Sequence, residues 1–208
     1  MEDRKLTEKE SLELISQMII NTRRRIEIGD SNILLLWGLS TVVIGLAVYI
    51  LVMTTKNPGF HGLWGLLGLV GLYNARIEKK RENNGSQSYT DRISKGIWNV
   101  IGVTAIISVA CSFICQIQTG IAAVYGCMVF FALIIIGLGV AMQGIVIKER
   151  SMVIGGTFSV CCGMLLACLL IAYDTLYVTY TMPVLILCYI VMMVMPGCIL
   201  RSKAKKQK

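Results

Sequence analysis

The most reactive side chains in this sequence are those of cysteine and methionine, whose soft sulfur atoms suit Cu(I). Cys111 and Cys115 lie one helical turn apart, and a second cluster near the carboxyl end comprises Met192, Met193, Met195 and Cys198. All eight cysteines fall in apolar runs, where small thiols fill gaps between helices. A disulfide framework would place them in loop-rich sequence instead. We therefore expect no bound metal and no cofactor.

Groups for acid–base or nucleophilic catalysis are scarce. The only histidine, His61, and Asp174 lie at the ends of apolar runs and not deep inside them, where ionisable groups mark ion pathways. No nucleophile–base pair, phosphate loop or dinucleotide fingerprint can be assembled from the sequence. We therefore expect that the protein is not an enzyme. Asn99 and Gln143 fall near one end of their runs, where we expect headgroup water to reach them.

One small, polar face could line a cavity. Its members recur every three or four residues, so that they share one side of a helix: Thr104, Ser108, Cys111 and Ser112. A face that packs against another helix has the same composition. In that alternative the hydroxyl groups bond back to carbonyls of their own helix.

The composition is that of a membrane protein. The chain is 55% hydrophobic and only 15% charged, and its mean hydropathy is +0.70. A soluble domain carries about 25% charged residues. The net charge of +8 does not indicate nucleic-acid binding, because basic clusters between apolar runs face anionic lipid headgroups. We expect the lipid bilayer to be the main partner.

Long apolar segments organise the chain. Residues 96–147 contain no Asp, Glu, Lys, Arg or His. As one helix they would extend about 78 Å, more than twice the roughly 30 Å of a bilayer core. The polar break at 116–120 divides them into two spans. The whole chain is predicted to be an all-α membrane protein with six transmembrane helices in three hairpins (33–75, 97–147 and 152–200), the spans covering about residues 33–54, 60–75, 97–117, 121–147, 152–173 and 182–200.

The first 32 residues are predicted to form a cytoplasmic amphipathic helix over 7–28 and a turn at 29–32, where glycine, aspartate, serine and asparagine cluster. This helix either docks a cytoplasmic protein or the membrane surface, or packs on the bundle's own loops. Its basic triplet, Arg23, Arg24 and Arg25, is a candidate for contact with anionic lipids. Residues 33–200 form the transmembrane domain, and 201–208 form a basic tail.

The second span carries glycine at every third position, namely Gly62, Gly65, Gly68 and Gly71. Glycine allows the backbone of a neighbouring helix to approach closely. We therefore predict that this stripe is a close-packing surface. The apolar part of this span is short for a full crossing, and a re-entrant segment is the alternative.

The distribution of basic residues predicts the orientation. With six spans, nineteen of the twenty Lys and Arg residues fall on one side and only Lys56 falls on the other. Lys and Arg are enriched in cytoplasmic loops. We therefore expect both termini, the hydrophilic loop at 76–95 and residues 148–150 to be cytoplasmic, in a multi-pass protein of the cell inner membrane.

The sequence resembles a group of small uncharacterised polytopic membrane proteins of gut Bacteroidota. The resemblance rests on Glu10-Ser11-Leu12 through Ile19-x-x-Thr22-Arg23, on Trp37-Gly38, and on Tyr89-Thr90-Asp91-Arg92 before Trp98. It implies an inner-membrane location. The group has no assigned activity, so it supplies no catalytic residues.

Two functions remain open at this point. The first is a regulatory, scaffolding or sensing component that acts through its cytoplasmic face, with residues 7–28 contacting a protein partner. The second is a small-solute transporter or channel lined by the second and third spans. Self-association into a homo-oligomer is compatible with either function.

Overall fold

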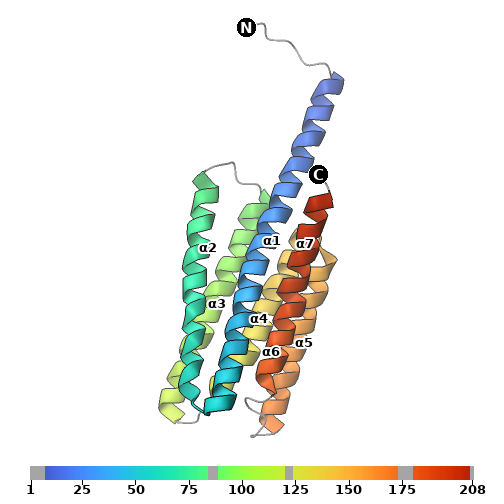
Figure 1. Ribbon diagram of the computed structural model, residues 1–208. Helices are drawn as coiled ribbons and strands as arrows, with labels where there is room; N and C mark the ends of the chain where they lie inside the picture. The colour runs from blue at the N-terminus through green and yellow to red at the C-terminus, as the bar shows by residue number, and fades with distance from the viewer. Residues whose placement is uncertain (1–7, 84–88, 120–123, 173–179, 207–208) are drawn as a thin grey trace.

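The computed structural model describes residues 8–83, 89–119, 124–172 and 180–206, and every regular element in these ranges is a helix. The helices lie side by side in an elongated bundle (Figure 1). This confirms the predicted all-helical architecture. Five segments are long and apolar enough to cross a membrane: Asn32–Thr55, Tyr89–Gln118, Cys127–Val146, Arg150–Leu169 and Thr181–Lys203.

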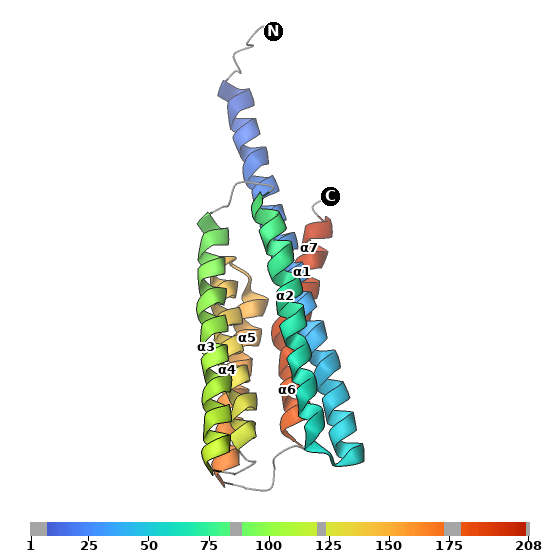
Figure 2. The ribbon, with the colours of Figure 1, turned by 90° about the vertical axis from the view of Figure 1, so that its left-hand side faces the viewer.

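The first helix, α1 (Glu8–Thr55), is continuous, so the predicted turn at 29–32 is wrong. The segment contains no proline, and every residue keeps the N–H that a helix needs. A glycine such as Gly29 costs only about 1 kcal/mol inside a helix, which the long flanking helical segments override. The amino-terminal part of α1 extends well beyond the other helices (Figures 1 and 2). The predicted contact of Arg23, Arg24 and Arg25 with anionic lipids stays a prediction, because their side chains are not among those that the structure describes.

The carboxyl end of α1 is closed by local hydrogen bonds. The hydroxyl of Thr55 donates to the carbonyl of Leu51 at 2.6 Å. Lys56 adopts a left-handed backbone conformation (φ 54°), and its N–H donates to the carbonyl of Val52 at 2.8 Å. This arrangement is an αL cap, which uses carbonyls left unpaired by the end of a helix. The chain therefore turns between the first two spans, as the predicted hairpin at 33–75 requires.

The second span begins as a 3₁₀ helix, η1 (Pro58–Gly65), and continues as α2 (Leu66–Asn83). The side chain of Asn57 caps η1 by accepting from the N–H of Gly59 at 2.9 Å. Because α2 runs to Asn83 and α3 (Tyr89–Thr119) begins at Tyr89, much of the predicted loop at 76–95 is helical. Both helices therefore extend past the ends of the apolar segments, into the hydrophilic residues between them.

The predicted close-packing stripe on the second span is wrong for most of its length. A side-chain carbon added at Gly62, Gly65 or Gly68 would meet nothing within 4 Å. Only Gly71 has a neighbour, the Trp37 ring at 3.5 Å, which is ordinary contact. A glycine pattern shows where close approach is sterically allowed, and another helix must still lie there.

Close packing occurs instead between α4 (Val124–Val146) and α5 (Arg150–Ala172). A side-chain carbon at Gly156 would lie 2.5 Å from the carbonyl oxygen of Gly137 and 2.6 Å from the nitrogen of Ala141. The hydroxyl of Ser159 donates across this contact to the carbonyl of Leu133 at 3.1 Å. Small residues on both helices allow the two backbones to approach closely. Helices in a lipid bilayer associate in this way, because the hydrophobic effect does not drive them together there.

The last span is not one regular helix. It consists of α6 (Thr181–Tyr189), a π-helix η2 (Ile190–Val194) and α7 (Met195–Lys206). Pro196 lies just after η2 and is fully buried. Proline has no N–H and its ring collides with the carbonyl four residues earlier. The wider π turn accommodates this collision, and the Met195 N–H donates to the carbonyl of Ile190, five residues earlier.

The helices form two layers. One layer contains α3, α4 and α5, and the other contains α1, α2, α6 and α7 (Figure 2). Within the first layer α4 packs on both neighbours, and within the second α1 packs on α2, α6, η2 and α7. The layers meet mainly where α5 contacts α6, η2 and α7. α3 contacts mainly α4, so much of its surface is exposed.

Gly156→Ala is expected to destabilise the protein, whereas Gly68→Ala is not. The added methyl group at Gly156 collides with the backbone of α4, and such overpacking costs roughly 1–3 kcal/mol. The same methyl group at Gly68 enters open space, and alanine favours a helix. Thermal unfolding of both variants in detergent measures the difference. Equal unfolding midpoints for the two variants would contradict the α4–α5 contact.

Candidate functional site at the interface between the layers

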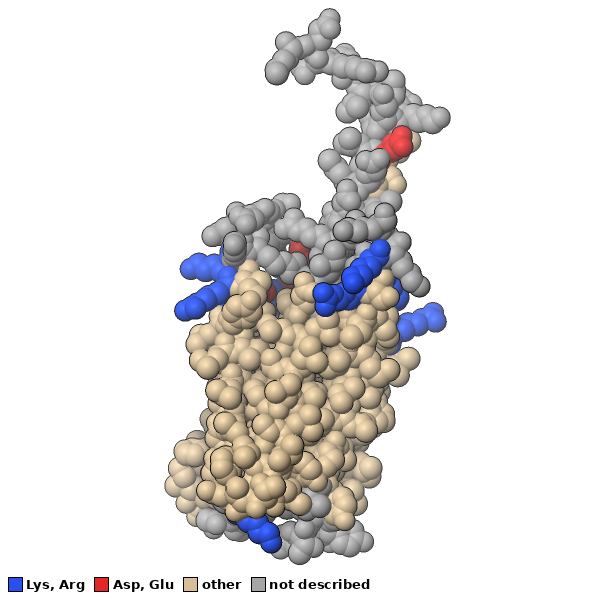
Figure 3. Space-filling model, in the orientation of Figure 1, with Lys and Arg blue, Asp and Glu red and all other residues tan. Residues whose placement is uncertain are grey.

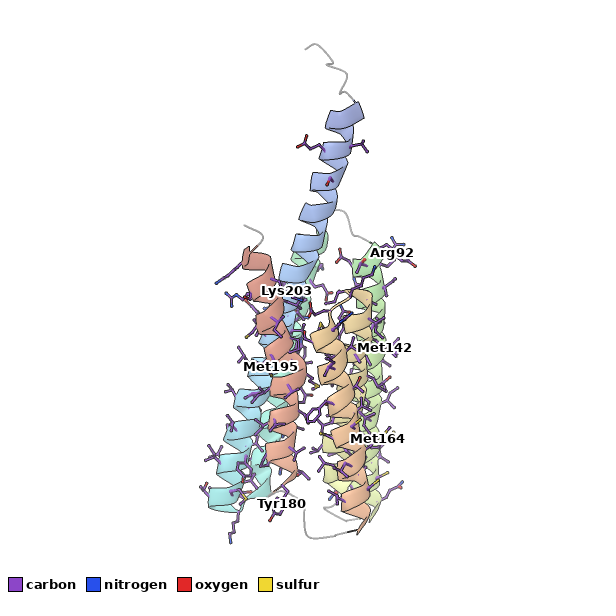
Figure 4. All side chains as sticks on the ribbon, turned by 90° about the vertical axis from the view of Figure 1, so that its right-hand side faces the viewer. Arg92, Met142, Met164, Tyr180, Met195 and Lys203 are labelled. Atoms are coloured by element: carbon purple, nitrogen blue, oxygen red, sulfur yellow. The ribbon has the colours of Figure 1, made fainter. Side chains whose placement is uncertain are left out.

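The interface between the two layers carries the most distinctive chemistry among the described residues. Along α5 it comprises an ion pair at one end, a backbone contact with the π-helix, and the apolar core that α5 shares with α6. Figure 4 views the bundle with Met164 of α5 on one side of this interface and Met195 of α7 on the other. Each contact joins residues that are far apart in the sequence.

The ion pair lies at the end of the bundle where α1 projects. Glu149 is nine-tenths buried, and its Oε2 accepts from Nζ of Lys203 at 2.6 Å. Its Oε1 accepts from the hydroxyl of Ser151 at 3.0 Å, and the Ser151 N–H also bonds to this carboxylate. Glu149 therefore caps the amino end of α5 and holds α7 against it. One carboxylate joins the two layers.

The turn that presents Glu149 has defined geometry. Lys148 adopts a left-handed conformation (φ 59°), and its N–H donates to the carbonyl of Ile145 at 3.2 Å. The Glu149 N–H donates to the carbonyl of Gly144 at 2.8 Å. These two bonds make a Schellman motif, which normally places glycine where Lys148 stands. The fixed turn orients the Glu149 side chain towards α7.

The environment changes the acidity of Glu149. Burial raises the pKa of this carboxyl group because it penalises the charged form. The hydrogen bonds from Lys203 and Ser151, together with the charge of Lys203, outweigh burial and hold its pKa below the ordinary value of 4.5. The carboxylate is therefore ionised at neutral pH. Since the Lys203 side chain is 52% exposed, solvent weakens the attraction.

In the middle of the interface, two helical backbones touch. A side-chain carbon at Gly155 would lie 2.7 Å from the carbonyl oxygen of Val191 in η2. On the opposite side of η2, a carbon at Gly38 of α1 would lie 2.9 Å from Cβ of Met193. The π-helix is thus held between two glycines. The Val191 carbonyl receives no hydrogen bond from the two residues that follow η2. The N–H of Met195 donates to the carbonyl of Ile190 instead, and Pro196 has no N–H.

The third feature is the apolar core shared by α5 and α6. Cys188 of α6 is fully buried in this core together with Leu133 and Met192. Cys162 of α5 is half-buried and packs against the same core. All eight cysteines are thiols in this structure. Among the described residues, no three His, Cys, Asp or Glu side chains come together as a metal site would require.

The predicted polar face on α3 does not line a cavity as a unit. Thr104 and Cys111 are exposed on the outside of the bundle, Ser108 is partly exposed, and only Ser112 is buried. The three hydroxyl groups donate to carbonyls of their own helix, at Val100, Thr104 and Ser108, over 2.8–2.9 Å. The hydroxyl groups thus bond back to their own helix, but with Thr104 and Cys111 exposed the face does not pack against another described helix as a unit either.

One polar residue differs from expectation. Gln143 was expected to contact headgroup water, but it is only 2% exposed. Its Nε2 donates to the hydroxyl of Ser94 at 2.9 Å, which joins α3 to α4. Sequence reasoning also missed Glu149, which was placed in a short connecting turn. One signal in the sequence could have identified it. An acidic residue just before a predicted helix is a candidate for capping the amino end of that helix.

Comparisons with other proteins add no assignment. No protein-family model, no curated protein and no solved structure matches this chain.

Glu149→Gln is expected to lower the free energy of unfolding at neutral pH by roughly 1 kcal/mol, since it weakens both the cap and the ion pair. Because the folded pKa of Glu149 is depressed, its contribution is complete above the ordinary value of 4.5 and is lost as pH falls through the lower folded pKa. Unfolding midpoints measured between pH 7 and pH 3 should therefore fall more for the wild type than for Glu149→Gln. The exposed Lys205→Gln variant serves as control. Identical pH profiles for wild type and Glu149→Gln would contradict the role of this pair.

Proposed function

We propose that this chain is a multi-pass protein of the cell inner membrane that acts, without catalysis, through its cytoplasmic face as a regulatory, scaffolding or sensing component. The observation that carries the proposal is the continuity of α1 from the bundle into a projecting segment. A helix without a turn transmits tilt and rotation between its ends. The predicted turn at 29–32 would have uncoupled them.

The length of α1 supports this assignment. Its 48 residues extend about 72 Å, whereas a bilayer core is roughly 30 Å thick. About 40 Å of helix therefore remains outside the hydrocarbon. Leu12, near its free end, is 68% exposed. An isolated helix is marginally stable in water, and an amphipathic one gains stability by burying its apolar stripe against another surface. A cytoplasmic protein is the partner that we propose for this segment.

Charge supports the orientation. Basic side chains gather at the end of the bundle from which α1 projects, and a broad belt without Lys, Arg, Asp or Glu lies below them (Figure 3). Arg92 and Lys203 lie at this end, while Lys56 follows α1 at the opposite one. By the positive-inside rule the basic end is cytoplasmic. This distribution supports the six crossings in three hairpins, with both termini inside, that we propose; the second crossing, formed by η1 and α2, is not among the five segments that are apolar enough by themselves.

The transporter or channel alternative gains no support from the described residues. It required the second and third spans to line a path. Gly62, Gly65 and Gly68 of the second span face open space, and the hydroxyl groups of α3 bond to their own helix. The first function is therefore preferred.

Reporter fusions test the orientation. A reporter inserted at Asn57 should be active outside the cytoplasm, and one inserted at Asn84 or after Lys206 should be active inside it. The reason is the basic charge that surrounds the latter two positions. An external reporter at Asn84 would show that the second span does not cross, and would overturn the six-span topology.

A photo-crosslinking residue tests the partner. Placed at Leu12 of the full-length chain in native membranes, it should give a specific adduct with a cytoplasmic protein. At Val43, which is 62% exposed in the first span, it should react only with lipid or membrane proteins. Removal of residues 8–28 should abolish retention of the same protein without lowering the unfolding midpoint of the bundle. If the shortened chain instead binds or moves a solute, the transporter function holds.

A further inference from the structure

At the end of the bundle from which α1 projects, basic side chains are separated from the acidic side chains beside them. Three described clusters, at 76–79, 91–95 and 148–150, each contain two basic residues and one acidic residue. In every cluster the acidic residue is less exposed than both basic ones, and Glu149 is nine-tenths buried. The six exposed basic residues, which we call the basic rim, are Arg76, Lys79, Arg92, Lys95, Lys148 and Arg150.

This separation gives the surface more positive charge than the sequence suggests. Each cluster has a small net charge, because one acidic residue offsets one of its two basic residues. In the turn at 148–150, however, Glu149 is directed into the interface between the layers, where Lys203 neutralises it at 2.6 Å. The two basic residues of the turn are left on the surface. The rim spans both layers, from α2 to α3 and the α4–α5 turn, and basic side chains lie on both sides of this end in Figure 3.

Exposed apolar side chains lead up to two of the cations. On α5, Ile154 and Phe158 follow Arg150 at intervals of four residues, so all three share one exposed face. On α4, Ile145 is 66% exposed three residues before Lys148. A phospholipid has the matching arrangement, with a phosphate above its acyl chains. A free phosphate or a soluble polyanion would use the cations alone.

We propose that the basic rim binds anionic phospholipids in preference to zwitterionic ones, through their phosphate groups. Both classes carry a phosphate, but the rim repels the cationic part of a zwitterionic headgroup. Each basic side chain near an anionic surface contributes about fivefold in affinity, from about 1 kcal/mol. The rim belongs to the bundle itself and does not include residues 23–25. The inference depends on neither the proposed cytoplasmic partner nor the proposed orientation.

The test uses the purified full-length protein in detergent micelles, which leave both ends of the bundle open to added lipid. Phosphatidylglycerol and phosphatidylcholine with identical acyl chains are titrated separately, and the rise of the unfolding midpoint gives an apparent dissociation constant for each. Phosphatidylglycerol should bind more tightly. Salt at about 1 M should abolish the difference, because it shortens the screening length to roughly 3 Å. Equal binding of the two lipids at low salt would overturn the proposal. An equal rise with inorganic phosphate alone would overturn the assignment to a lipid.

Two lysines provide matched variants. Lys148 and Lys56 both follow a helix in a left-handed backbone conformation (φ 59° and 54°), at opposite ends of the bundle. Asparagine tolerates this conformation, so each Lys→Asn change removes a charge and keeps the turn. Lys148→Asn should weaken phosphatidylglycerol binding about fivefold and leave phosphatidylcholine binding unchanged, whereas Lys56→Asn should change neither. Arg150→Gln should repeat the effect of Lys148→Asn, and it replaces that variant if the turn does not fold. The proposal fails if the rim variants bind phosphatidylglycerol as tightly as Lys56→Asn does.

Discussion

The structure depends on one constraint, which is that backbone N–H and C=O groups in apolar surroundings must find partners within the protein. It explains why the described elements are all helices. It also explains the last span, where Pro196 removes a donor from the middle of the bundle. The chain responds with a π turn, and the widened backbone fits because Gly155 and Gly38 leave room on both sides. The π turn that precedes this proline is thus in contact with glycines on two other helices.

Much of the architecture could be predicted because hydropathy and charge are local properties. The helical spans, the division of residues 96–147 between two helices and the concentration of basic residues at one end all follow from short stretches of sequence. The polar residues 116–119, predicted as the break, continue α3 as helix. The continuity of α1 was missed for a related reason. Turn-forming residues at 29–32 favour a break only weakly, and without a proline the helix tolerates them.

The interface between the layers could not be predicted, because its residues are brought together only by tertiary packing. The stripe from Gly62 to Gly71 has the stronger glycine pattern, yet the close backbone contact between the layers lies at Gly155. The sequence says where a backbone is free to approach, not which helix is its neighbour. Glu149 and Lys203 are 54 residues apart, and no periodic pattern connects them.

The contacts along the interface differ in what can disrupt them. The Glu149–Lys203 pair lies beside the aqueous end, so protons and salt can reach it, and its half-exposed lysine keeps it weak. The π-helix contact in the middle is steric and depends only on the absence of side chains at two glycines. Cys188 lies in the apolar core and Cys162 packs against it, where changes in pH or salt have little effect. Loosening of α7 at the aqueous end therefore need not separate α5 from α6. α1 packs on α6, η2 and α7, which together form the last span. It therefore contacts both α7, which can loosen at the aqueous end, and α6, which lies in the apolar core.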